Sequence, residues 1–341
     1  MRNFPVLLLF LLPGMITASE PVERKITMVQ EATRITERDI RKATKSESEK
    51  NTDGGYNANV SVVDCFAAMK YHYTGGRYDN EPLLFRLLSP DQVESGKTYP
   101  LIIWFHGKGE SGEDNTRQLS HVQSTLPFLA GKEKLEFFMV ATQCPKDNPY
   151  WETTIEFDDK GDASMTILNE IIEAILEEYP IDRNRIGVFG LCSGGNAAWQ
   201  YVANHPGRFA SLAVCSSTPP AEPTDLFLNT AIWAFNNEDD TVPFQNTERF
   251  VEMINEAGGN AYLTLHQTGG HDAWSGALAN DKVIGWMLLQ SLDKPGPPQG
   301  VICYHRSKIE QFFLFGLPVL CLIVLSAVFA MKKKKCPADE T

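Results

Sequence analysis

Short apolar runs alternate with longer amphipathic stretches between about residue 60 and residue 292. Continuous apolar runs of this kind are typical of strands buried on both faces, and apolar positions three or four residues apart are typical of helices. The predicted strands are Met69–Tyr73, Leu83–Leu88, Leu101–Phe105, Phe137–Ala141, Arg185–Phe189, Ala210–Val214, Ala231–Phe235 and Ala261–Leu265. The predicted helices are Gln118–Leu129, Ala163–Tyr179, Asn196–Ala203, Thr247–Ala257 and Asp281–Leu292.

This alternation predicts one α/β domain over residues 59–293. We expect the first two strands to form an antiparallel pair, and the others to form a mostly parallel sheet with helices on both faces. In such sheets the functional loops gather at the carboxyl ends of the strands. The loops that follow the predicted strands are therefore the place to look for chemistry.

The N-terminal residues indicate export. Met1–Ala18 has a basic start at Arg2, an apolar run and small residues before Ser19, which is the pattern of a signal peptide cleaved after Ala18. Residues 19–58 form a polar arm with only a loose apolar spacing, which fits either a marginal surface helix or a disordered segment.

The C-terminal residues indicate a membrane anchor. Residues 294–311 begin as a Pro/Gly-rich spacer, and Phe312–Met331 is uncharged and long enough for one transmembrane helix. Four lysines then open the tail, residues 332–341, and mark its side of the membrane as cytoplasmic. The predicted protein is a single-pass membrane protein whose domain lies outside the cytoplasm, in the periplasm or the extracellular space.

Charge and cysteine content limit the possible partners, disulfides and metal sites. The formal net charge of -12 argues against a nucleic-acid partner, since phosphate binding needs clustered Lys and Arg. Five of the seven cysteines precede the predicted span, an odd number that leaves at least one thiol free or paired between chains. Cys65 with Cys144 is the disulfide to test first. No HExxH or paired CxxC motif occurs, so we predict neither a metal site nor a cofactor.

The most informative motif is Gly190–Gly195, between a predicted strand and a predicted helix. A G-x-S-x-G nucleophile elbow occupies such a strand–turn–helix context, and here Cys192 stands at its centre. The turn needs small residues two before and two after the nucleophile, which Gly190 and Gly194 provide for Cys192. Ser193 is the alternative nucleophile, but Leu191 would then occupy one of those positions. We expect Ser193 to offer its backbone N–H to the oxyanion instead.

Further candidates follow other strands. Asp239 comes after the strand at residues 231–235 as the acid, with Glu238 and Asp240 as competitors, and His271 comes after the strand at residues 261–265 as the base. The order nucleophile, acid, histidine is that of α/β-hydrolases. His106-Gly107-Lys108-Gly109 follows the strand at residues 101–105, where we expect an N–H near Lys108 or Gly109 to complete the oxyanion hole. His106 is expected to shape this loop and not to act as the base.

The residues from Met69 to Leu292 resemble an α/β-hydrolase of the dienelactone hydrolase, phospholipase/carboxylesterase and polyhydroxybutyrate depolymerase-like group. The segments that carry the resemblance are Tyr99–Asn115, Ala141–Pro145 and Asp182–Ile186, the last leading into the elbow. Most members of the group have serine at the position of Cys192, whereas dienelactone hydrolases have cysteine in a similar G-x-C-x-G-G setting. The spacing from Asp239 to Val242-Pro243 is also similar to that in the group.

The sequence thus predicts a membrane-anchored hydrolase of carboxylic esters or lactones that uses Cys192, His271 and Asp239. A small ester, a lactone or a short polymer is the expected substrate. Two alternatives remain open at this point: a binding domain that kept the fold and lost turnover, and a peptidase-like member of the same fold.

Overall fold

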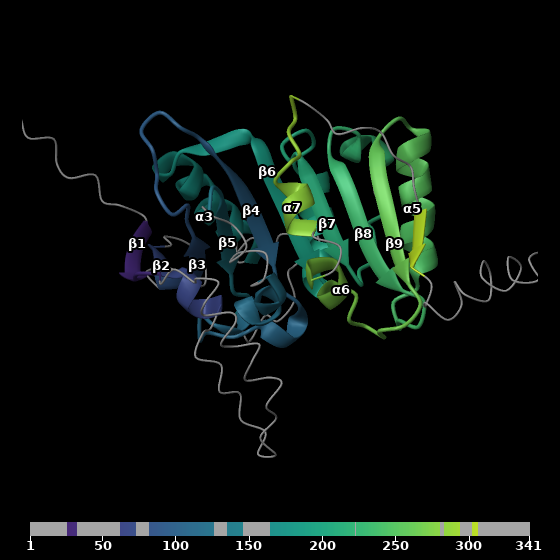
Figure 1. The fold of residues 1–341 in the computed structure, drawn as a ribbon, viewed down its shortest axis with the longest axis horizontal. Coiled ribbons are helices and arrows are strands. Elements are labelled where there is room, and N and C mark those ends of the chain that lie inside the picture. Colours follow the sequence, from purple (N-terminus) through teal and green to yellow (C-terminus); the bar gives the residue numbers. More distant parts are fainter. Residues whose placement is uncertain are drawn as a thin grey trace, which may run out of the picture.

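A computed structural model of the chain describes residues 26–32, 62–72, 82–125, 135–145, 164–221, 223–279, 283–293 and 302–305. Ten strands of these residues form one sheet in the order β1-β2-β3-β5-β4-β6-β7-β8-β9-β10 (Figure 1). The strands are β1 (Ile26–Gln30), β2 (Ala67–His72), β3 (Pro82–Leu88), β4 (Tyr99–Phe105), β5 (Phe138–Thr142), β6 (Ile181–Leu191), β7 (Ser211–Cys215), β8 (Ala231–Asn237), β9 (Asn260–His266) and β10 (Ile302–His305).

The sheet divides into an antiparallel part and a parallel part. β1, β2, β3 and β5 pair antiparallel to one another in turn, whereas every pairing from β5 through β4 to β10 is parallel. The predicted antiparallel opening pair and the mostly parallel α/β sheet are therefore confirmed. Because β4, β6, β7, β8 and β9 run in one direction, the loops after them lie along one edge of the sheet.

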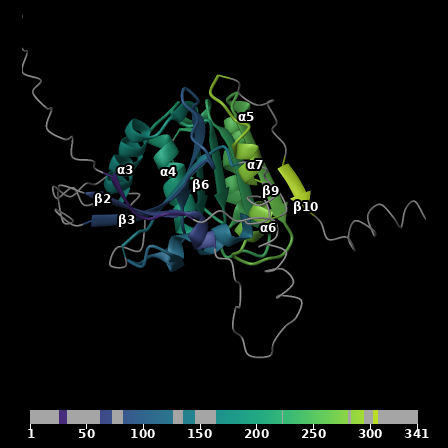
Figure 2. The same cartoon turned by 60° about the vertical axis from the view of Figure 1, so that its left-hand side comes forward.

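Helices cover both faces of the sheet (Figure 2). One face is packed by α3 (Ser164–Glu178), α4 (Ser193–Ala203) and α5 (Phe244–Glu256). The other is packed by α6 (Trp274–Ala279), α7 (Val283–Met287) and the 3-10 helices η1 (Val62–Cys65) and η4 (Arg117–Thr125). Two further 3-10 helices complete the described elements, η3 (Lys108–Glu110) and η5 (Thr224–Phe227).

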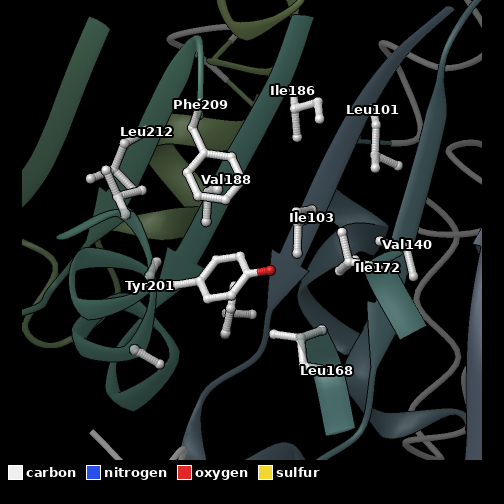
Figure 3. Close-up of a cluster of buried hydrophobic side chains, with 14 of the residues drawn as sticks. Leu101, Ile103, Val140, Leu168, Ile172, Ile186, Val188, Tyr201, Phe209 and Leu212 are labelled. Carbon is white, nitrogen blue, oxygen red and sulfur yellow. The ribbon is translucent and has the colours of Figure 1, made fainter. Parts of the chain in front are cut away.

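The apolar run of β4 anchors the core. All seven residues of this strand are buried, as expected for a strand covered on both faces. Figure 3 shows Leu101 and Ile103 of β4 beside Ile186 and Val188 of β6, with α3 and α4 side chains packed over them. The packing of β4 and β6 in the core thus fixes the points at which the loops after these two strands begin.

The structure adds two strands that the sequence did not predict. β1 lies within the predicted polar arm and β10 within the predicted spacer, yet both belong to the sheet. The sheet therefore extends beyond the predicted limits of residues 59–293. In β1 only the first residue is fully buried, which explains why the apolar pattern there is too weak to indicate a strand.

Two predicted helices also differ. Residues 117–125 form the 3-10 helix η4, in which the Gln118 carbonyl accepts a hydrogen bond from the Trp104 indole at 3.0 Å. The expected helix at residues 281–292 is represented by the short α7, with α6 before it. Cys65 and Cys144 are both buried and neither forms a disulfide, so the disulfide expected between them is wrong.

Among the helices that the structure describes, none is both long enough and apolar enough to cross a membrane. The predicted signal segment and the predicted span at residues 312–331 both lie outside the described residues.

Candidate active site

Cys192 occupies a strained turn between β6 and α4. Its backbone has φ 53° and ψ −124°, a conformation that residues with a side chain rarely adopt. The Cys192 N–H donates to the Cys215 carbonyl of β7 at 3.0 Å, and its own carbonyl accepts the N–H groups of Gly195 and Asn196. The sharp strand-to-helix turn expected from the sequence is confirmed, and it places Cys192 at the N-terminus of α4.

The glycines on either side make this turn possible. A Cβ on Gly190 would collide with the Gly194 carbonyl, and a Cβ on Gly194 would collide with the carbonyls of Phe105 and His106. The elbow therefore packs directly on the backbone of the loop after β4. This contact brings the Cys192 turn and the predicted oxyanion loop together.

We expect Gly194→Ala to lower the free energy of unfolding by at least about 2 kcal/mol, because the added methyl group displaces backbone at the elbow. Gly109→Ala is the matched control, since a Cβ on Gly109 meets no atom within 4 Å. Urea unfolding of the two variants measures the difference. Equal stabilities would contradict the close packing of elbow and loop.

His271 contacts Asp240, and not Asp239. The His271 Nδ1 atom lies 2.9 Å from Asp240 Oδ1, and the Asp240 side chain is fully buried. Both residues lie in loops at the carboxyl ends of neighbouring strands, Asp240 after β8 and His271 after β9. An imidazole with a buried carboxylate on Nδ1 keeps Nε2 free to accept a proton, which is the geometry of a general base.

The prediction of Asp239 as the acid beside His271 is therefore wrong by one residue. The Asp239 carboxylate accepts the N–H groups of Gly269 and Gly270, at 3.3 and 2.8 Å. Asn237 supports the same loop by donating from Nδ2 to the Gly270 carbonyl at 3.0 Å. Asp239 thus holds the loop that carries His271, while Asp240 contacts the imidazole itself. The competitor Glu238 is exposed.

Asp240 is held in its ionised form. Burial alone would raise its pKa, but hydrogen bonds from the Val242 N–H and from His271, with the nearby Ser216 hydroxyl, bring the pKa below its usual value. The Val242 N–H donates to Oδ1 at 3.0 Å. Ser216 follows β7 and has φ 47°, a second strained residue at this edge of the sheet. An Asp240 that is ionised at neutral pH can stabilise the imidazolium that would form if His271 took a proton.

His106 shapes the loop after β4, as expected. It is fully buried, its Nε2 accepts the Cys144 N–H at 2.8 Å, and its Nδ1 donates to the Gly107 carbonyl at 2.6 Å. Burial lowers its pKa to about 4. The ring is therefore neutral, and both of its nitrogens are used to fix the start of the loop that carries Lys108 and Gly109.

The depressed pKa of His106 predicts a pH-dependent stability. In the unfolded chain the pKa of histidine is about 6.5. Between about pH 6.5 and 4 the unfolded state therefore binds a proton at His106 that the folded state does not bind. The free energy of unfolding should fall by about 3 kcal/mol through this window, and the contribution is fully present above it.

Urea unfolding at several pH values, with wild type beside His106→Gln, measures this effect. The variant should be less stable at neutral pH and should lose less stability on acidification. The same loss of stability in both proteins would contradict the assignment to His106.

The predicted oxyanion donors lie on two sides of the elbow. Ser193 is the first residue of α4, and Lys108 and Gly109 form η3 with Glu110. A Cβ built on Gly107 would lie only 3.3 Å from the Cys192 Cβ, so the loop borders the Cys192 side chain. The arrangement can offer an N–H from each side to an oxygen formed beside Cys192.

Trp274 packs against His271. Its ring lies edge-on to His271, with centroids 5.5 Å apart, and it belongs to the apolar cluster against which Cys192 packs. Within the described part of the chain, no hydrogen bond joins the Cys192 thiol to His271. Bonds between nucleophile and base are often long without substrate and tighten when substrate is bound.

Two features of the site were missed from the sequence. Ser216 directly follows β7, and functional loops gather at the carboxyl ends of parallel strands, so its position in the sequence could have indicated it. Glu110 and His121 form a second carboxylate–imidazole contact at 3.2 Å, beside the elbow. Nothing in their spacing of eleven residues indicates that they meet.

Comparison with known proteins places this geometry in a family. A family model described as "Putative esterase" matches residues 79–273. The crystal structure of a thermostable esterase is 28% identical with a TM-score of 0.57, over 67% of this chain and 64% of that one. A ferulic acid esterase is 20% identical with a TM-score of 0.50, over 64% of this chain and 95% of that one. The search of curated proteins found no match.

Proposed function

The chain belongs to the Esterase family, and we propose that it hydrolyses carboxylic esters or lactones through a Cys192–His271–Asp240 triad. The family and the thermostable esterase support an enzyme that acts like an ester hydrolase. The triad, the substrate range and the location of the enzyme are the parts that we add from the residues. The acid of the triad is now Asp240, which takes the place given to Asp239 from the sequence alone.

The proposed reaction has two steps. His271 Nε2 takes the thiol proton as Cys192 Sγ attacks the ester carbonyl, and N–H groups of Ser193 and the Lys108–Gly109 loop bind the oxyanion. His271 then gives the proton to the leaving alcohol, which leaves a thioester on Cys192. Water, deprotonated by the same imidazole, attacks the thioester, and the acid departs as the thiol is restored.

One observation carries this proposal: the strained backbone of Cys192, φ 53°, at a turn that admits only glycine on either side. Strain of this kind persists only where the surrounding structure enforces it, and it is concentrated at functional sites. The peptidase alternative gains no support from a specific contact.

The proposal is tested by alcohol release from short-chain esters, and by ring opening of a small lactone, with the full-length protein. Turnover that saturates with substrate and disappears on heat denaturation supports a hydrolase. A folded protein that releases no alcohol from any of these substrates would overturn it.

We also propose that the enzyme is anchored in a membrane with its domain outside the cytoplasm. The uncharged segment at residues 312–331, the four lysines that follow it and the signal pattern of Met1–Ala18 support this orientation. Protease added to cells whose plasma membrane is intact, with any outer membrane removed, should then digest the domain and spare the C-terminal tail. A domain that is protected until the plasma membrane is broken would contradict this orientation.

A further inference from the structure

A second carboxylate–imidazole pair, which the proposed reaction does not use, lies beside the elbow. Glu110 ends η3 and His121 lies in η4, with 3.2 Å between Glu110 Oε1 and His121 Nε2. Because a carboxylate only accepts hydrogen bonds, the Nε2 atom carries the proton. The two side chains are 14% and 30% exposed, so the pair is sheltered and still open to a ligand.

The pair lies next to the Cys192 side chain. A Cβ built on Gly107 would lie 3.0 Å from Glu110 Oε2 and 3.3 Å from Cys192 Cβ, so the carboxylate and the cysteine border the same point. The centroid of the Trp274 ring lies 5.0 Å from that of His121 and 5.5 Å from that of His271. The Glu110–His121 pair and the His271–Asp240 pair therefore both contact Trp274.

Glu110 is held in place with one oxygen unused. Its N–H donates to the Gly107 carbonyl at 3.2 Å, and its own carbonyl accepts Gln143 Nε2 at 2.9 Å. Oε1 is occupied by His121, whereas Oε2 accepts no hydrogen bond from any residue in the described ranges. A fixed acceptor next to the nucleophile is a suitable partner for a donor on the substrate.

The carboxylate itself favours one kind of donor. Its hydrogen bond to a cation is stronger than its hydrogen bond to a neutral hydroxyl. The loops at this edge of the sheet also expose more acidic than basic side chains, which favours a cation as well. The acidic ones are Glu113, Asp114, Glu238, Asp239 and Asp272, and the basic ones are Lys108 and Arg117.

We propose that Glu110 Oε2 binds an ammonium group on the carbon next to the scissile carbonyl, so that α-aminoacyl esters are the preferred substrates. This inference rests on the proposed function, because it assigns the acyl group to the same site. In such an ester one carbon separates the ammonium from the carbonyl that Cys192 attacks. The short span matches a carboxylate that borders the cysteine side chain.

The test compares ethyl esters of alanine and of isobutyric acid, which differ by an ammonium in place of a methyl group. At about pH 6.5 the α-amino group is protonated. We expect kcat/KM for the alanine ester to exceed that for the isobutyrate ester by about tenfold or more. Glu110→Gln should lower kcat/KM for the alanine ester by about ten- to a hundredfold and leave the isobutyrate ester nearly unchanged.

Glu252→Gln is the matched control, since it removes the same charge from an exposed position on α5, which packs on the opposite face of the sheet. It should keep the preference of the wild type. A wild type that shows no preference for the alanine ester would overturn the inference. So would an equal loss of both activities in Glu110→Gln, because Glu110 would then act only on the structure of the loop.

Binding separates this inference from the proposed function. Alaninamide and isobutyramide are a matched pair that requires no ester turnover, and their binding is followed by NMR titration. If neither ester is hydrolysed, the proposed function fails. The ammonium site still stands if alaninamide binds more tightly than isobutyramide and Glu110→Gln removes the difference. Equal binding of the two amides overturns the ammonium site whether or not the esters are hydrolysed.

Discussion

Cys192→Ala is expected to lower kcat for a short-chain ester by about ten-thousand-fold or more, because it removes the atom that would form the covalent intermediate. The substitution keeps a Cβ at the strained position, so the elbow should keep its conformation. Initial rates of alcohol release, with far-UV circular dichroism to verify folding, measure the effect.

Ser193→Ala provides the matched control at the adjacent residue. Ser193 is expected to contribute its backbone N–H, which alanine retains, so turnover should stay within about tenfold of the wild type. The Ser193 hydroxyl is also buried without a hydrogen-bond partner, so no contact depends on it. The opposite pattern, with Ser193→Ala inactive and Cys192→Ala active, would make serine the nucleophile.

Asp240→Asn is expected to reduce kcat/KM by about a thousand- to ten-thousand-fold. An amide at this position can donate to His271 Nδ1, which leaves the proton on Nε2 and prevents the ring from accepting one from Cys192. It also removes the charge that stabilises the imidazolium. The measurement is the rate of ester hydrolysis at a pH near neutrality.

Asp239→Asn is the neighbouring control. The asparagine retains an oxygen that can accept the Gly270 N–H, so the loop that carries His271 should keep its place and activity should fall by less than about tenfold. If Asp239→Asn were the more damaging of the two changes, the acid of the triad would be Asp239, as the sequence first indicated.

The sequence was sufficient for the central strands and for the elbow. The run Leu101–Phe105 is apolar at every position, and Gly190 and Gly194 mark a turn whose sterics follow from the absence of a Cβ. Features of this kind depend on local pattern alone. The order of nucleophile, acid and histidine along the chain could likewise be predicted, since parallel strands bring their carboxyl ends to one edge.

The choice between Asp239 and Asp240 required the structure. Adjacent loop residues point in different directions, and no periodicity exists in a turn to say which one faces His271. Here the N–H groups of Gly269 and Gly270 donate hydrogen bonds to the Asp239 carboxylate, whereas the Asp240 carboxylate contacts the His271 imidazole. The Glu110–His121 contact is of the same kind, because it depends on how η3 and η4 pack together in the connection between β4 and β5.

The edge strands were missed for a different reason. Among the described strands, β1 and β10 pair with one neighbour each, at the ends of the sheet. A strand at an edge gains part of its stability from backbone hydrogen bonds to that neighbour, which leave little trace in the side chains. In β1 only Ile26 is buried, and the apolar side chains of Met28 and Val29 are exposed, so its apolar residues do not form the pattern of a strand packed on a core.

The central claim is that Cys192 forms a covalent intermediate, and mass spectrometry of the acid-quenched enzyme during ester turnover tests it most directly. The proposed reaction predicts an added acyl mass on the peptide that contains Cys192, and its absence in Cys192→Ala. Acylation of Ser193 in the wild type, or turnover of the ester with no acylated protein under conditions that trap a thioester, would contradict it.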